Sequence, residues 1–100
     1  MDDNCLKYKL TAIERDGFEE TGMLVVEDAL NQDLVAHLTA LADATFHRAL
    51  SNGHSKAGSL FYPNFIPEDP AYVELVDHPM ILPKVWGILG WNIYLYHAHL

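Results

Sequence analysis

The last eleven residues place the strongest constraint on what this chain can fold into. After Gly90-Trp91, aromatic and aliphatic residues alternate in the way that is typical of a covered β-strand. The alternation assigns one set of side chains to one face (Ile93, Leu95, His97 and His99) and a second set to the other (Asn92, Tyr94, Tyr96 and Ala98). No turn, partner strand or polar tail follows, so we expect a strand that has been cut from its sheet.

The composition is that of an ordinary globular chain, with 50% hydrophobic and 20% charged residues in 100 residues. This length allows one domain or part of one. A small chain buries a lower fraction of its surface than a large one, so the loss of partner strands would leave it marginally stable. We therefore expect an isolated piece to be poorly folded or prone to stick.

The charge balance excludes several classes of partner. With a net charge of −8 and only six Lys and Arg residues, the chain is unsuited to nucleic acid or to an anionic membrane surface. No basic stretch with an apolar run marks a secretory signal, and no apolar run approaches the roughly 18 residues of a membrane span. The single cysteine, Cys5, cannot form an internal disulfide, and we expect it to be an incidental exposed thiol near a frayed N-terminus. These features predict a cytoplasmic protein.

The first half of the chain predicts two helices with a strand between them. Residues 10–17 form a short helix, with Thr11 as N-cap, Glu14 as its capping-box partner and Gly17 at its end. The apolar run 22–26 is the first expected strand. A longer helix follows Asn31 and closes at Asn52-Gly53, with an apolar stripe formed by Leu34, Val35, Leu38, Leu41, Ala42, Thr45, Phe46 and Ala49.

The second half is interrupted by prolines. A polar loop at 51–59, which contains His54, leads to a short strand at 60–62. The Pro67–Pro70 turn opens a short helix, and Pro79 begins another that ends at Gly90. The apolar positions of that last helix are Ile81, Leu82, Val85, Trp86 and Leu89. Strands separated by helices suit either an α/β sheet or an α+β edge, and the pattern does not decide between them.

Several of these stretches together resemble the N-terminal part of the phytanoyl-CoA dioxygenase family. They are Asp16-Gly17-Phe18, Met23-Leu24-Val25-Val26, the helix after Asn31, Asp77-His78-Pro79 through Gly90, and above all Trp91-Asn92-Ile93-Tyr94-Leu95-Tyr96-His97-Ala98-His99-Leu100. The resemblance implies an α+β chain, consisting of the N-terminal helices and first strands of an incomplete double-stranded β-helix, a jelly-roll or cupin-like fold. Residues 1–100 would then be the leading part of one domain, truncated before its metal-binding motif.

The resemblance also implies an enzyme, a non-haem Fe(II)- and 2-oxoglutarate-dependent dioxygenase that hydroxylates a small organic substrate. His97 and His99 would line the 2-oxoglutarate pocket. Iron in such enzymes needs two imidazoles and a carboxylate, and His97-Ala98-His99 lacks the carboxylate, so we assign no metal ligand or catalytic residue here. We expect this chain alone to be inactive and to bind neither Fe(II) nor 2-oxoglutarate tightly.

Two other interpretations remain open. The chain could be a complete interaction module without catalysis, which associates with itself or a partner through the edge of its C-terminal strand. Alternatively, His97 and His99 could bind a metal together with a distant side chain such as His78, because residues i and i+2 of a strand point the same way.

Overall fold

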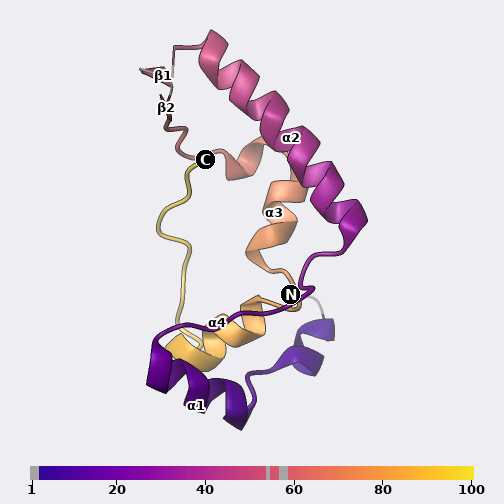
Figure 1. Ribbon diagram of the computed structural model, residues 1–100, viewed down its shortest axis with the longest axis vertical. Coiled ribbons are helices and arrows are strands. Elements are labelled where there is room, and N and C mark those ends of the chain that lie inside the picture. The colour runs from indigo at the N-terminus through magenta and orange to yellow at the C-terminus, as the bar shows by residue number, and fades with distance from the viewer. Residues whose placement is uncertain (1–2, 54, 57–58) are drawn as a thin grey trace. The chain divides into compact units, whose positions relative to one another are not determined.

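The computed structural model describes residues 3–53, 55, 56 and 59–100 (Figure 1). In chain order the elements are η1 (Asp3–Tyr8), α1 (Ala12–Thr21), α2 (Gln32–Ser51), β1 (Ser55–Lys56), β2 (Ser59–Leu60), η2 (Ile66–Glu68), α3 (Pro70–Val76) and α4 (Leu82–Leu89). The chain divides into two compact units. The first unit contains Met1–Ala29 and Leu75–Tyr94, and the second contains Leu30–Glu74 and Leu95–Leu100.

The predicted α+β class is wrong, because the described residues are mainly helical. Extended pairing among them is confined to the antiparallel β1–β2 pair, with Ser55 opposite Leu60 and Lys56 opposite Ser59, and to one bridge between Pro63 and His99. A strand is stable only when its backbone groups pair with neighbours. The apolar runs that predicted a longer sheet do not find such neighbours within the described residues. His54, in the predicted loop, lies outside those residues.

Helix α1 confirms the predicted start and corrects the predicted end. The Thr11 side chain accepts a hydrogen bond from the Glu14 backbone, and the Glu14 carboxylate accepts one from the Thr11 backbone, which completes the capping box. The helix does not stop at Gly17. It continues to Thr21 and ends at Gly22, whose φ of 72° is a left-handed cap conformation that glycine adopts without steric cost.

The predicted strand at 22–26 is also wrong. Residues 23–26 have no regular structure. Two side chains of this segment, Leu24 and Val26, line a cavity of about 280 Å³ together with Phe18, Ile81, Lys84, Val85 and Ile88. The apolar run thus packs within the first unit through side chains and not through a ladder of backbone hydrogen bonds.

The core of the first unit lies where η1 and α4 meet. Cys5 is fully buried, in contrast to the exposed thiol that we predicted, and its Sγ lies 3.9 Å from the Asp77 carbonyl oxygen. Trp86 of α4 is 8% exposed and stacks on Trp91 with ring centroids 4.4 Å apart. The N-terminal segment is therefore part of the packed structure.

Helix α4 begins later than predicted. Residues 79–81 form a turn, and the helix starts at Leu82 with Pro83 in its first turn, so Pro83 takes the position that we predicted for Pro79. The missing N–H of a proline is harmless there, because the first N–H groups of a helix have no intrahelical partner. Gly90, with φ of 89°, ends the helix as predicted.

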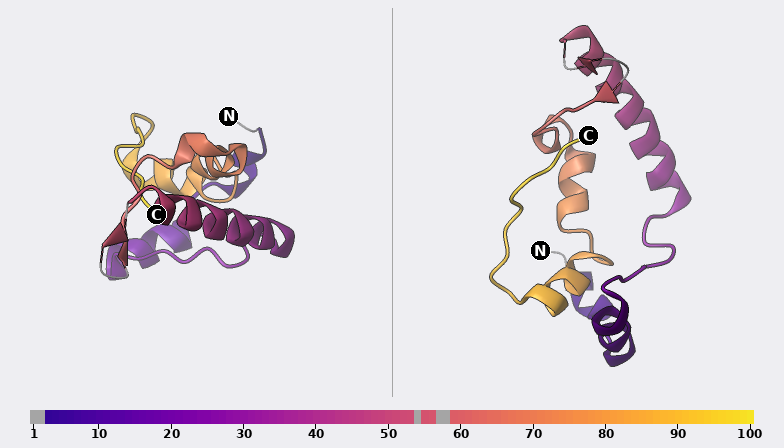
Figure 2. Two further views of the ribbon diagram at one scale, coloured as in Figure 1. Left: turned by 90° about the horizontal axis from the view of Figure 1, so that it is seen from above. Right: turned by 60° about the vertical axis from the view of Figure 1, so that its left-hand side comes forward.

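Helix α2 confirms its prediction and dominates the second unit as one unbroken helix (Figure 2). Its N-cap is Asn31, whose side chain accepts a hydrogen bond from the Leu34 backbone at 2.8 Å. The buried part of the predicted stripe is narrower than expected, because Thr45 and Ala49 are buried while Val35 and Phe46 are exposed.

Helix α3 packs its first turns against α2 within the second unit. Tyr72 is 3% exposed, and its hydroxyl shares a hydrogen bond of 2.9 Å with the hydroxyl of the fully buried Thr45. The Tyr72 ring also packs against Phe65 in a T-shaped, edge-to-face arrangement, with ring centroids 4.7 Å apart. The two buried hydroxyls thus form a hydrogen bond with each other, and this bond offsets the cost of removing them from water.

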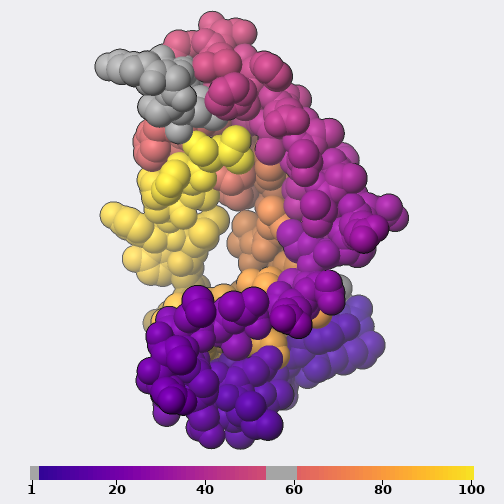
Figure 3. Space-filling model, viewed as in Figure 1, coloured from indigo at the N-terminus to yellow at the C-terminus, as the bar shows by residue number. Residues whose placement is uncertain are grey.

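The predicted C-terminal strand is the largest departure from expectation. Residues 91–98 have no regular structure, and His99 forms the bridge to Pro63. The end of the chain does have a partner, contrary to the prediction, because it runs antiparallel to residues 62–64. The space-filling view shows the C-terminal segment, in yellow, at the surface of the molecule (Figure 3).

Within the described part of the chain, every helix falls short of the length and apolar character that a bilayer crossing requires.

Candidate functional site

The backbone that carries His97 and His99 is held by an antiparallel contact in the second unit. Tyr62 and Leu100 exchange two backbone hydrogen bonds, with N to O distances of 3.1 and 2.9 Å. The Asn64 N–H also donates to the Ala98 carbonyl at 3.0 Å. Asn64 has a φ of 59°, a left-handed conformation that asparagine tolerates better than most residues. The last residues therefore lie beside residues 62–64. The predicted strand at 60–62 is not formed as such, because β2 ends at Leu60.

The two candidate imidazoles lie next to each other on this segment. The ring centroids of His97 and His99 are 5.0 Å apart, with 46° between the ring planes. Phe61 contacts both: it stacks on His97 at 6.4 Å and lies tilted against His99 at 5.2 Å. Both histidines are exposed. The structure thus forms a three-ring cluster, Phe61, His97 and His99, of which the sequence indicated only the two histidines.

A cavity of about 310 Å³ lies beside this cluster. Its lining comes from two stretches of the second unit, Asn64, Ile66 and Pro67 on one side and Leu95, Tyr96, His97 and Ala98 on the other. Both histidines contact Phe61, but of the two only His97 belongs to the described lining of the cavity. The role of either residue in binding 2-oxoglutarate stays a prediction.

The chemistry of the cavity suits a carboxylate only weakly. Its lining contains one imidazole and one side-chain amide as hydrogen-bond donors, together with the Tyr96 hydroxyl, and has no Lys or Arg among the described residues. Strong carboxylate sites use a charge-assisted or bidentate donor such as arginine. The described lining therefore does not form a complete site for a dicarboxylate such as 2-oxoglutarate.

The residues present do not fit a mononuclear iron site. Among the described residues, no group of three or more His, Cys, Asp or Glu side chains is placed to hold a metal ion. The alternative arrangement of His97 and His99 with His78 stays a prediction, because His97 and His99 belong to the second unit. His78 lies in the first unit, where its Nδ1 accepts a hydrogen bond from the Met80 backbone at 3.3 Å.

A polar network that sequence reasoning did not predict begins at Tyr62, the residue after Phe61. The Tyr62 hydroxyl donates to one carboxylate oxygen of Glu68, and Arg48 donates to the other at 2.8 Å. Arg48 also donates to Thr45 at 3.2 Å, so the network connects α2 to η2. No local pattern marks Arg48 and Glu68 as partners, because they lie twenty residues apart and in different elements.

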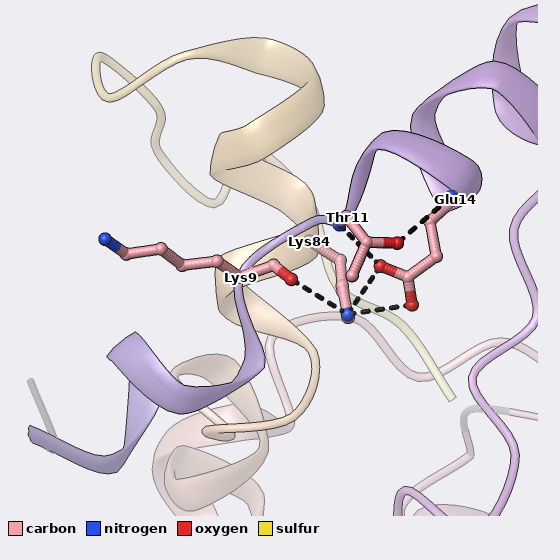
Figure 4. A network of polar contacts seen from close by, with 4 residues as sticks. All are labelled: Lys9, Thr11, Glu14 and Lys84. Carbon is pink, nitrogen blue, oxygen red and sulfur yellow. Dashed lines mark hydrogen bonds and ion pairs between the residues drawn. The ribbon is translucent and has the colours of Figure 1, made fainter.

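A second polar network lies in the first unit, around Lys84 (Figure 4). The ammonium group donates to both carboxylate oxygens of Glu14, at 2.8 and 2.7 Å, and to the Lys9 carbonyl at 3.2 Å. The hydrogen bond from Lys84, followed by that from the Thr11 backbone, lowers the pKa of Glu14 below its ordinary value. All three donors of the ammonium are used, so Lys84 does not offer a charge to the adjoining cavity.

Comparison with models of protein families, with curated proteins and with solved structures found no match to this chain.

Proposed function

We propose that residues 1–100 form the leading, helical segment of a non-haem Fe(II)- and 2-oxoglutarate-dependent oxygenase, with the iron ligands provided by sequence outside this segment. The observation that carries the proposal is the stretch Trp91–Leu100. It holds the most specific part of the sequence resemblance, and its last residues place His97 and His99 side by side next to a cavity. By this proposal the full enzyme hydroxylates a small organic substrate.

The exposure of the same stretch supports this interpretation. In the first unit Trp91 and Tyr94 are 68% and 82% exposed, and in the second unit Leu95 and Tyr96 are 57% and 86% exposed. Each unit thus has large exposed apolar side chains in this stretch that another element could cover. In an oxygenase, the strands that carry the iron ligands would supply this cover.

The residues of this segment would then bind and orient the co-substrate without touching the metal. A neutral imidazole of His97 or His99 can donate one hydrogen bond to a carboxylate, and a protonated one can also offset its charge. The iron, when bound elsewhere in the enzyme, supplies the oxidative chemistry. We also propose a cytoplasmic location, which is supported by a single cysteine that cannot form an internal disulfide.

The test is an assay of the protein encoded by the reading frame that continues past Leu100. We expect succinate to form from 2-oxoglutarate only when Fe(II) is present, and we expect the 100-residue chain to form none. In the longer protein, His99→Gln should raise the KM for 2-oxoglutarate. The control His47→Gln, at an exposed position of α2, should leave this KM unchanged. A longer protein that binds no iron and consumes no 2-oxoglutarate would contradict the proposal.

A second candidate from a different class is an interaction module that pairs through its C-terminal segment. It is favoured by the exposure of Tyr96, at 86%, on a stretch without regular structure that belongs to no sheet among the described residues. Sedimentation equilibrium of the 100-residue chain separates this candidate from the first. The module predicts a dimer that Tyr96→Asp weakens and Ile13→Asp, at an equally exposed position of α1, does not.

A further inference from the structure

We infer that His97 and His99 together form a two-imidazole chelate for a divalent transition-metal ion of the copper, nickel and zinc group. This site is distinct from an oxygenase iron site, because it uses no carboxylate and needs no third protein ligand. It uses the same two imidazoles to which the proposed function assigns 2-oxoglutarate binding, but it involves only residues of this chain, so its test does not require the longer enzyme.

The ring separation carries the inference. A metal–nitrogen bond is about 2.0 Å, and each coordinating nitrogen lies roughly 1.1 Å from its ring centre, so an ion bound to both rings leaves the centres roughly 4.4 Å apart at a right angle and roughly 5.1 Å apart at a tetrahedral angle. The observed separation is 5.0 Å. The two rings therefore already lie at the distance that one ion requires, and binding then needs one nitrogen of each ring to turn toward the ion.

The backbone under the two rings is held in place before any ion binds. The hydrogen bonds of Leu100 to Tyr62, at 3.1 and 2.9 Å, and of Asn64 to Ala98, at 3.0 Å, flank His99 on both sides. Phe61 covers one flank of both imidazoles. A preorganised pair of ligands loses little conformational freedom on binding, which raises affinity without any additional contact.

The ligand chemistry selects the class of ion. Imidazole suits copper, nickel and zinc, whereas Mg²⁺ and Ca²⁺ prefer oxygen ligands. Both histidines are exposed, so an ion can reach them from solvent and keep water in its remaining positions. Among the divalent ions of this group we expect Cu²⁺ to bind most tightly.

The test is an isothermal titration calorimetry experiment in which Cu²⁺ is added to the full 100-residue chain at physiological ionic strength. We expect one ion per chain, no competition from excess Mg²⁺, and a loss of affinity of about tenfold to a hundredfold in His97→Gln and in His99→Gln, because the second imidazole binds intramolecularly. The matched control is the double variant His37→Gln/His47→Gln, which removes two exposed imidazoles ten residues apart on α2. It should bind within twofold of the parent chain.

A second measurement on the unsubstituted chain does not depend on the folding of variants. Substoichiometric Cu²⁺ should broaden the imidazole proton signals of His97 and His99 first, together with the ring signals of Phe61. The inference is overturned if the signals of His37 or His47 broaden first, if either single variant binds within twofold of the parent chain, or if the control variant loses as much affinity as the single ones.

Discussion

At the scale of a single residue, the side chain of Lys84 connects α4 to α1 and to the segment before α1. Its ammonium bonds to the Lys9 carbonyl and to the Glu14 carboxylate, while its own backbone lies in α4. The Lys84 side chain is 11% exposed and that of Glu14 is 29% exposed. An ion pair at this depth is worth more than one on the open surface, because solvent screens it less.

Replacement of Lys84 with methionine should lower the free energy of unfolding by about 1–2 kcal/mol, because it leaves the Glu14 carboxylate and the Lys9 carbonyl without their donor. Urea unfolding at pH 7 measures the loss. The matched control is Lys9→Met, since Lys9 contributes its backbone carbonyl to the network while its side chain points away (Figure 4). Equal effects of the two substitutions would show that the Lys84 contacts do not stabilise the fold.

The same contact predicts a dependence of stability on pH. The folded state lowers the pKa of Glu14 from its ordinary 4.5, so the unfolded state binds the proton more readily. The contribution of Glu14 is therefore fully present above pH 4.5 and is lost as the pH falls through the lower folded-state pKa. The stability difference between the parent chain and Glu14→Gln should shrink between pH 5 and pH 2. A difference that grows on acidification would contradict this account.

At the scale of secondary-structure elements, the approach of α4 to the segment before α1 depends on one glycine. A Cβ atom added at Gly87 would lie 2.7 Å from the Cβ of Leu10, which is too close for a carbon pair. The Gly87 carbonyl also accepts a hydrogen bond of 2.7 Å from Arg15 of α1. The absence of a side chain at Gly87 lets Leu10 pack closely against α4, next to the carbonyl that Arg15 contacts.

Two glycine-to-alanine substitutions should therefore change stability in opposite directions. Gly87→Ala should destabilise the first unit by about 1–2 kcal/mol, because the overpacking against Leu10 outweighs the gain in helix propensity. Gly17→Ala should stabilise it by about 0.5–1 kcal/mol, since Gly17 lies inside α1 with no atom near its Cβ position. Thermal unfolding of the two variants checks the signs, and stabilisation by Gly87→Ala would show that this contact is not tight.

The elements that sequence reasoning predicted correctly are those that local contacts determine. The capping box of Thr11 and Glu14, the Asn31 cap of α2 and the Gly90 end of α4 each involve residues within four positions of one another. The strands at 22–26 and 91–100 were predicted wrongly, because an apolar alternation shows that a segment could pair but not how much of it finds a partner. In the last stretch the pairing is limited, among the described residues, to 98–100 with 62–64. The predicted end of α1 at Gly17 and the predicted start of α4 at Pro79 were wrong for a related reason. Both residues permit a helix boundary without requiring one.

In the candidate site too, sequence reasoning predicted the residues that are close together in the chain and missed those that are far apart. The alternation predicted that His97 and His99 share one side of the chain, and the structure places their rings 5.0 Å apart. The third ring, Phe61, comes from a segment more than thirty positions earlier in the sequence, so no local pattern could indicate it. The same holds for the salt bridge between Arg48 and Glu68.

At the scale of the whole molecule, the helical architecture predicts the spectroscopic behaviour of the chain. The far-ultraviolet circular dichroism of the 100-residue protein should be dominated by helix, mainly from α1 and α2, which are 10 and 20 residues long. A spectrum dominated by β-structure would contradict the correction of the fold class. The stacked pair Trp86 and Trp91 should add a near-ultraviolet signal that disappears together with the helical signal on heating, because Trp86 belongs to the packed core.

The central claim is that this chain is the leading segment of an iron- and 2-oxoglutarate-dependent oxygenase, and the coding sequence beyond Leu100 tests it most directly. The account predicts that the reading frame continues, with a His-x-Asp or His-x-Glu motif within a few tens of residues and a further histidine after it, which together complete the facial iron triad. A stop codon immediately after Leu100, or a continuation without these residues, would contradict the claim and leave the interaction module as the remaining proposal.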